Sequence, residues 1–287
     1  MAEQPEVFLD RMTWPQIEAA IAAGRTRAVV CLAATEQHGP HLPEGTDAWL
    51  GEELAGRLAH ALGDALVAPV IRPGCSEYHM GFAGTITVPA KVMVALLDAY
   101  VDSLSRHGFK QFLVFTSHGG NLPALTSWPG RNRPQVTVLD DLGAVVAAIR
   151  AALSGFGAVG PAGQHADLGE TAAMLATRPE LVRLERAEAG FQGELGLGEL
   201  LANGTRALSP TGTFGDPTGA TTAMGAAVLG AWTNCLLDSL RGKALCSGGR
   251  YWRNRNARLA GSGRSGRVAA GVVSVRSGSV AARCDLG

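Results

Sequence analysis

The sequence lacks an excess of charge of either sign. Among its 287 residues, 25 Lys and Arg balance 25 Asp and Glu, so the formal net charge is +0 at pH 7. A balanced chain has no global attraction for nucleic acid or for an anionic membrane surface. The balance hides one local excess, because residues 241–287 contain ten basic groups, nine Arg and Lys243, against the single acid Asp285.

Cysteine is scarce and unpatterned, and no stretch is suited to cross a membrane. The five cysteines show no CxxC spacing, so they predict reduced core thiols and neither a disulfide framework nor a zinc ribbon. Residues 217–237 carry no charge, but their Gly, Thr and Asn favour a buried helix over a membrane span. Residues 1–6 have neither the basic nor the apolar region of a signal peptide, which predicts a cytoplasmic protein.

Apolar strands and helical patterns alternate along residues 14–240. The predicted strands are 28–33, 65–71, 111–116 and 136–139. The predicted helices are 14–23, 50–61, 89–106, 142–153, 167–177 and a last helix from Pro217 to about Leu240. This rhythm is typical of an α/β protein whose mainly parallel sheet is covered by helices on both faces.

The chain divides by composition into a patterned part, residues 1–241, and a basic tail, residues 242–287. The tail is a run of Gly, Ser, Arg, Ala and Val without a sustained period, which predicts disorder. A nucleic-acid-binding arm is the alternative interpretation. Aromatic residues in the tail are confined to Tyr251 and Trp252, so a dispensable extension is favoured and nucleic acid is not an expected partner.

The densest group of acids and histidines directly follows the first predicted strand. Glu36 and His38 lie two residues apart, so an extended backbone projects them to the same side, and Asp47 follows in the same loop. Carboxylate and imidazole together suit Zn²⁺, Mn²⁺ or Fe²⁺ better than Ca²⁺ or Mg²⁺. The alternative makes Asp47 a helix N-cap and His41 a hydrogen-bonded loop histidine, and for His41 both interpretations stand equally.

Two further motifs follow later elements. His118 ends the third predicted strand and precedes Gly119 and Gly120, whose main chain can approach a substrate closely and offer N–H groups to an oxyanion. His165 precedes a predicted helix with Glu170 in its first turn. The motif around His165 also fits a capping box, in which Asp167 caps the helix and Glu170 occupies the third helical position.

In combination, these motifs resemble the creatininase (creatinine amidohydrolase) family. The resemblance covers roughly residues 10–240 and rests on Glu36–Pro43, Gly45–Asp47, Gly81–Thr85, His118–Asn121, His165 with Glu170 and Thr171, and Gly215–Pro217. It implies a three-layer α/β/α sandwich with a mainly parallel central sheet. It also implies a homo-oligomer, usually a hexamer, and a hydrolytic site with two divalent metal ions per chain.

Motif positions carry the family's site onto this sequence. The metal ligands that the resemblance implies are Glu36, His38, Asp47, His118 and Glu170. Asp47 would bridge the two ions. In creatininase proper one carboxylate ligand lies two residues after the strand-end histidine, where this sequence has Gly120, so Glu170 is the expected substitute. His165 matches the family's proton shuttle, so His165 and Glu170 are the expected catalytic residues.

The resemblance implies a metal-dependent hydrolase that cleaves an amide-type C–N bond in a small molecule or short peptide with a metal-activated water. Creatinine is not the expected substrate, because no tryptophan lies between Trp128 and Trp232 to stack on its ring. Tyr78 and His79, in the irregular segment 73–85, are candidate substrate contacts beside Gly119 and Gly120.

Three alternatives stay open at this point. The motif at 118–121 and the GDPxxAT pattern at 215–221 are shared with the peptidase of mycofactocin maturation and with a formamide hydrolase of deazaflavin and riboflavin synthesis. The third alternative is a binding protein that keeps the fold without turnover. A metal content below one ion per chain would favour it.

Overall fold

The computed structural model describes residues 5–158, 163–193 and 196–242. Four strands form one parallel sheet in the order β2-β1-β3-β4. Their bounds are β1 Arg27–Leu32, β2 Ala65–Val67, β3 Gln111–Thr116 and β4 Val136–Leu139. The sequence prediction of a mainly parallel sheet is therefore confirmed.

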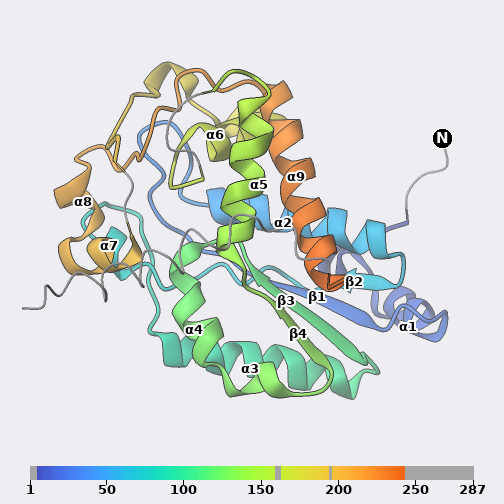
Figure 1. Cartoon of the computed structure of the whole chain (residues 1–287). Helices are drawn as coiled ribbons and strands as arrows, with labels where there is room; N and C mark the ends of the chain where they lie inside the picture. The colour runs from blue at the N-terminus through green and yellow to red at the C-terminus, as the bar shows by residue number, and fades with distance from the viewer. Residues whose placement is uncertain (1–4, 159–162, 194–195, 243–287) are drawn as a thin grey trace, which may run out of the picture. The chain divides into compact units, whose positions relative to one another are not determined.

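Helices cover both faces of the sheet, because alternate strand residues point to opposite sides. One face packs Ala28, Val30 and Phe112 against helices α1 Trp14–Ala22, α3 Ala90–Arg106 and α4 Leu122–Ser127. The other face packs Val29 and Phe115 against α2 Thr46–Leu62, α5 Leu142–Ser154, α6 Leu168–Thr177 and α9 Thr222–Leu240. The three layers are visible in Figure 1, with α3 and α4 below the sheet and α2, α5 and α9 above it.

Two predicted boundaries differ from the structure. The second strand ends at Val67, well before the predicted residue 71, because Pro69 has no N–H to continue the ladder. The last helix begins at Thr222, later than the predicted Pro217, since Thr221 is its N-cap and its hydroxyl accepts from Met224 N. The stretch before it, which showed no clear pattern, contains the short helices α7 Leu197–Asn203 and α8 Thr205–Leu208.

The loops that carry the motifs leave the carboxyl ends of neighbouring strands. β1 and β3 are hydrogen-bonded from Arg27 with Gln111 to Leu32 with Thr116, so both strands end level with each other. The first loop continues into α2, and the second turns through the 3-10 segment Gly119–Asn121 into α4. Segments distant in sequence thus begin beside one another at one edge of the sheet.

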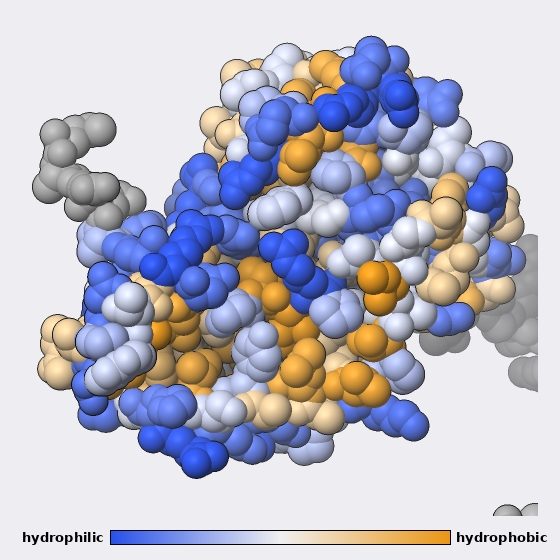
Figure 2. Space-filling view, turned by 180° about the vertical axis from the view of Figure 1, so that it is seen from behind, coloured by the Kyte–Doolittle hydropathy of each residue, from blue (hydrophilic) through white to orange (hydrophobic). Residues whose placement is uncertain are grey.

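The surface of the described residues is mixed in polarity. Exposed large hydrophobic side chains include Trp14, Met80, Ile86, Val92 and Leu201. Figure 2 shows the back of the molecule, where hydrophobic residues gather in the lower half above a hydrophilic border. Within the described parts of the chain, no helix combines the length and apolarity needed to cross a membrane. The predicted tail lies outside the described residues except for Gly242.

Candidate metal centre

The loop after β1 places Glu36 and His38 in the protein interior, where both are 0% exposed. His38 Nδ1 lies 3.0 Å from the main-chain oxygen of Glu36. A carbonyl oxygen only accepts, so Nδ1 carries a proton and Nε2 is the nitrogen left to bind a metal. That nitrogen lies 3.4 Å from Asp47 Oδ1 and 3.7 Å from Glu170 Oε2. Glu36 and His38 also lie together, since each offers a ligand-type atom within 4.8 Å of the other.

Asp47 and His118 complete the inner wall of the site. Asp47 lies in the first turn of α2, whose N-cap is Gly45, so the alternative that Asp47 caps this helix is wrong. His118 follows β3, and its Nδ1 lies 3.2 Å from Glu36 Oε1 and 3.3 Å from Asp47 Oδ2. Its Nε2 lies 3.3 Å from the main-chain oxygen of Cys75, which leaves the proton on Nε2 and aims Nδ1 at the carboxylates.

Glu170 reaches the site from the start of α6, and a cap holds it there. Asp167 is the N-cap and accepts from the main-chain nitrogens of Gly169 and Glu170 at 2.8 and 3.1 Å. The Glu170 carboxylate in turn accepts from Ala166 N at 2.6 Å. Asp167 therefore caps the helix as the alternative expected, but Glu170 accepts from Ala166 N and not from the N-cap N–H that a capping box uses, and its carboxylate also faces His38.

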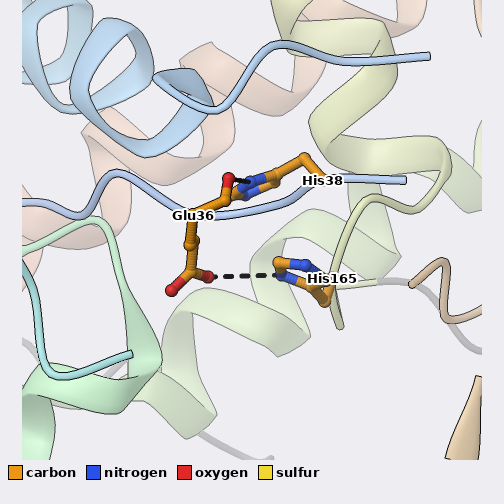
Figure 3. A group of neighbouring side chains, drawn as sticks. All are labelled: Glu36, His38 and His165. Carbon is orange, nitrogen blue, oxygen red and sulfur yellow. Dashed lines mark hydrogen bonds and ion pairs between the residues drawn. The ribbon is translucent and has the colours of Figure 1, made fainter. Parts of the chain in front are cut away.

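Among the residues that the structure describes, ligand-type atoms converge in three overlapping groups. In each group they lie within 4.8 Å of one another, and the groups are Glu36–Asp47–His118, His38–Asp47–Glu170 and Glu36–His38–His165. Asp47 belongs to the first two groups, so one carboxylate joins them. Figure 3 shows the third group, in which His165 and the Glu36 carboxylate face one another with Nδ1 3.7 Å from Oε1.

The polar atoms of this cluster fit a bound cation. Both carboxylate oxygens of Glu36, Nε2 of His38 and Oδ2 of Asp47 are buried without a hydrogen-bond partner. Leaving such groups unpaired in the interior is costly, and a cation at these positions would satisfy them. The donors are carboxylate oxygens and imidazole nitrogens, a set that suits Zn²⁺, Mn²⁺ or Fe²⁺.

The pKa shifts of the ligand-type residues also favour a bound cation. Burial lowers the pKa of His38, but the Asp47 and Glu170 carboxylates outweigh it and raise the pKa to about 10. Burial raises the pKa of Glu170 to about 8, with the Asp47 charge adding to it and His38 opposing it. Burial would also raise the pKa of Glu36, yet His118 and His79 hold it well below its usual range. The cluster thus gathers negative charge that only bound protons compensate.

His165 is partly buried and turns one ring nitrogen toward the proposed metal ligands. Its Nδ1 faces Glu36, and its Nε2 lies 2.8 Å from the main-chain oxygen of Gln37. Burial, and then the charge of His38, hold the pKa of His165 well below its ordinary value. A neutral ring at pH 7, with one nitrogen turned to the ligand cluster, can accept a proton there.

The predicted substrate contacts have different surroundings. Tyr78 is half-buried, with its hydroxyl 3.5 Å from His118 Nε2. His79 is buried, and its Nε2 lies 3.1 Å from Glu36 Oε1. A side chain at position 120 would overlap the His118 ring and begin 2.6 Å from the Tyr78 hydroxyl, so only glycine fits between them.

The structure adds Gln37, which the sequence reasoning did not single out, and shows the surroundings of His41. Gln37 is buried, and its side chain contacts both His79 and His165. Alternation along an extended loop turns Gln37 away from Glu36 and His38, so the sequence pattern gave no reason to place it beside the ligands. His41 is hydrogen-bonded to the Thr171 hydroxyl at 2.8 Å, in accord with its interpretation as a loop histidine.

Comparisons with known proteins place these motifs in a family. Residues 10–240 match the family model Creatininase, described as creatinine amidohydrolase. A "Mycofactocin precursor peptide peptidase" of Mycobacterium ulcerans (strain Agy99) is 36% identical over 226 residues, which are 74% of this chain and 79% of that protein. A "Creatinine amidohydrolase" of Pseudomonas putida is 29% identical over 196 residues, 63% of this chain and 75% of that protein.

Solved structures share the fold. The crystal structure of a creatinine amidohydrolase (creatininase) superposes with a TM-score of 0.68 at 24% identity, covering 84% of this chain and 99% of that chain. Other solved creatininases with the same fold include a "Zn-Zn type" and a "Creatininase Mn". The three-layer α/β/α sandwich that the resemblance implied is therefore confirmed.

Proposed function

The chain belongs to the creatininase family and is a hydrolase of amide-type C–N bonds, and we propose that it works with two divalent metal ions on a peptide substrate. The convergence of two ligand groups on the shared carboxylate of Asp47 carries this proposal. One ion would be held by Glu36, Asp47 and His118, and the other by His38, Asp47 and Glu170. Bound there, the ions would polarise a carbonyl group and lower the pKa of water.

The chain's own residues supply the proton transfer. His165 is the proposed shuttle, because its ring is neutral and its Nδ1 faces Glu36 at 3.7 Å. It accepts a proton from the attacking water at Nδ1 and returns it to the leaving nitrogen. Glu170 acts as a ligand whose carboxylate is fixed by Ala166 N. Main-chain N–H groups of Gly119 and Gly120 are proposed to donate to the developing oxyanion.

The proposed target is the C–N bond of a peptide. Support comes from the peptidase relative, whose identity of 36% over 226 residues exceeds that of the creatinine amidohydrolase relative, 29% over 196 residues. Tyr78 is the proposed substrate contact, since its half-buried hydroxyl adjoins His118. A formamide or cyclic amide is the alternative substrate within the same reaction class.

The same proposal includes a cytoplasmic homo-oligomer, a hexamer by family resemblance. Exposed hydrophobic side chains such as Met80, Ile86 and Val92 occur close together in sequence, and an interface between copies would cover surface of this kind. Figure 2 shows hydrophobic residues gathered over part of one face. Sedimentation of the purified protein would measure the number of chains.

Metal analysis followed by a substrate screen tests the function. The protein, loaded in turn with Zn²⁺, Mn²⁺ and Fe²⁺, is offered formamides, cyclic amides and short peptides. We expect about two ions per chain and hydrolysis of at least one peptide. Bound metal without hydrolysis of any compound would instead favour a binding protein that keeps the fold.

A variant of His165 tests the division of labour. His165→Ala is expected to keep its metal content and lose about 10²–10⁴-fold in kcat, the usual contribution of a general acid–base. His107→Ala is the matched control, because this exposed histidine caps α3 away from the described ligand cluster. Turnover unchanged by His165→Ala would refute the shuttle role.

A further inference from the structure

Gln37 occupies the centre of a buried hydrogen-bond network around the candidate metal centre. It is 3% exposed and lies in the chain between Glu36 and His38. Its amide nitrogen lies 2.9 Å from His79 Nδ1 and 2.8 Å from His165 Nε2. One side chain therefore contacts two histidines whose other ring nitrogens both face Glu36 Oε1.

The orientation of the Gln37 amide is fixed by the main chain. Gly39 N donates to its Oε1 at 2.9 Å, and an N–H group can bond only the oxygen of the amide. The amide nitrogen must therefore point to the opposite side, where the two histidines and the main-chain oxygen of Gly212, at 3.3 Å, lie. Gly212 leaves room for this amide, since a Cβ there would overlap Gln37 Oε1.

This orientation determines the tautomer of His79. An amide nitrogen only donates, so His79 Nδ1 accepts and the ring proton is on Nε2. That proton faces Glu36 Oε1 across 3.1 Å and favours the ionised carboxylate that a metal ligand needs. With the opposite tautomer, two lone pairs would face each other in the buried site.

Gln37 also contacts His165 in two ways at the same nitrogen. His165 Nε2 lies 2.8 Å from the Gln37 amide nitrogen and 2.8 Å from the Gln37 main-chain oxygen. The first can donate to Nε2 and the second can accept from it, so the ring keeps a hydrogen bond in either tautomer. The His165 ring can thus keep a hydrogen bond to Gln37 whichever ring nitrogen carries the proton.

We infer that Gln37 is a positioning residue, which fixes the Nε2–H tautomer of His79 beside Glu36 and holds the His165 ring with its Nδ1 toward the ligand cluster. The part that concerns His165 rests on the proposed function. The part that concerns His79 rests on geometry alone. The described hydrogen bonds of the Gln37 side chain go to His79, His165 and the main chain and to none of the proposed metal ligands, so it acts through the two rings.

The first test reads the tautomer directly in metal-free protein. Long-range ¹H–¹⁵N correlation spectra of ¹⁵N-histidine-labelled protein show which ring nitrogen is protonated, and His79→Gln assigns the His79 signals. We expect the Nε2–H tautomer of His79 in the wild type. A proton on Nδ1 of His79 in the wild type would overturn the inference without any variant at position 37.

The second test replaces the donor with an acceptor of the same shape. In Gln37→Glu the carboxylate can still accept from Gly39 N, but it can only accept at His79, so His79 Nδ1 is expected to become protonated. Gln111→Glu is the matched control, because Gln111 is exposed at the start of β3 and already accepts from Arg27. A His79 ring without a proton on Nδ1 in Gln37→Glu overturns the inference.

Thr205→Val separates Gln37 from the other polar neighbour of this ring. The Thr205 hydroxyl lies 3.0 Å from His79 Nδ1 and can donate or accept. Removing it should leave His79 in the Nε2–H tautomer if Gln37 is the determinant. If the His79 proton moves to Nδ1 in Thr205→Val and stays on Nε2 in Gln37→Glu, the tautomer is set by Thr205 and the inference is wrong.

The kinetic readout uses the compound that the wild type hydrolyses in the substrate screen. For Gln37→Glu we expect kcat to fall about 10–100-fold with KM, Zn²⁺ content and melting temperature near the wild-type values. A rise in KM with lower metal content and stability, at unchanged kcat, would show a merely structural role. The spectra need no substrate, so failure of the proposed function leaves the conclusion on His79 separately testable.

Discussion

Asp47→Asn is the substitution expected to affect metal binding most. Asp47 belongs to both proposed ligand groups, one with Glu36 and His118 and the other with His38 and Glu170. Its Oδ1 lies 3.4 Å from His38 Nε2 and its Oδ2 3.3 Å from His118 Nδ1, so each oxygen faces one group. An asparagine of the same shape presents one oxygen and no charge. Both ions should therefore be lost.

The size of the effect follows from linkage. Each ion at 100 times its Kd stabilises the folded state by about 2.7 kcal/mol, so two ions contribute roughly twice that. For a domain of this size, about 1 kcal/mol corresponds to roughly 2–4 °C in melting temperature, so removing metal should lower the wild-type Tm by about 11–22 °C. Glu170→Gln, which affects one group, should retain one ion and about half of this shift. Asp47→Asn should show almost no shift.

The assay compares each variant with and without metal. Melting curves recorded in chelator and in saturating Zn²⁺ give a difference within one variant, so any change in the stability of the metal-free protein cancels. Isothermal titration with Zn²⁺ gives the number of ions. Two ions bound by Asp47→Asn with wild-type affinity would contradict the shared role of Asp47, and with it the assignment of the two groups.

Two further predictions concern the lack of space for a side chain at Gly120 and the lowered pKa of His41. Gly120→Ala should weaken metal binding and lower the unfolding free energy by about 1–3 kcal/mol in melting experiments, because its Cβ would overlap the His118 ring and begin 2.6 Å from the Tyr78 hydroxyl. Gly119→Ala, with its nearest neighbour 3.8 Å away, is the control, and equal losses in both would exclude the steric cause. Burial, with the charge of His38 adding to it, lowers the pKa of His41 to about 4. The unfolded chain therefore binds more protons between about pH 4 and 6.5, and stability falls as the pH falls through this range. In chelator, urea unfolding of His41→Gln should depend less on pH there than that of the wild type, and equal slopes would contradict the buried neutral ring.

Much of the fold was predictable because it depends on local pattern. The strands at 111–116 and 136–139 agree with β3 and β4, since continuous apolar runs between helical patterns are typical of buried parallel strands. The boundaries were less predictable. An apolar run continues past Val67, but the missing N–H of Pro69 ends regular pairing, and the ladder that decides this involves residues far along the chain.

The candidate site was predictable in composition and not in arrangement. Ligand-type residues at strand ends could be read from Glu36, His38 and His118, because parallel strands present their carboxyl ends at one edge. The position of Glu170 could not be read in the same way, since its spacing fits a capping box equally well. Only the packing of α6 against α2 and α9 brings its carboxylate 3.7 Å from His38 Nε2.

The sequence by itself determined the parallel α/β architecture, the residue types for metal ligation and the family, since strand periodicity, side-chain chemistry and motif spacing are local properties. The tertiary structure decided which atoms meet. It joined two ligand groups through Asp47, left their inner atoms buried without partners, and turned Gln37 toward two histidines from separate segments. Such contacts depend on distances between segments far apart in sequence, and these distances exist only once both faces of the sheet are packed.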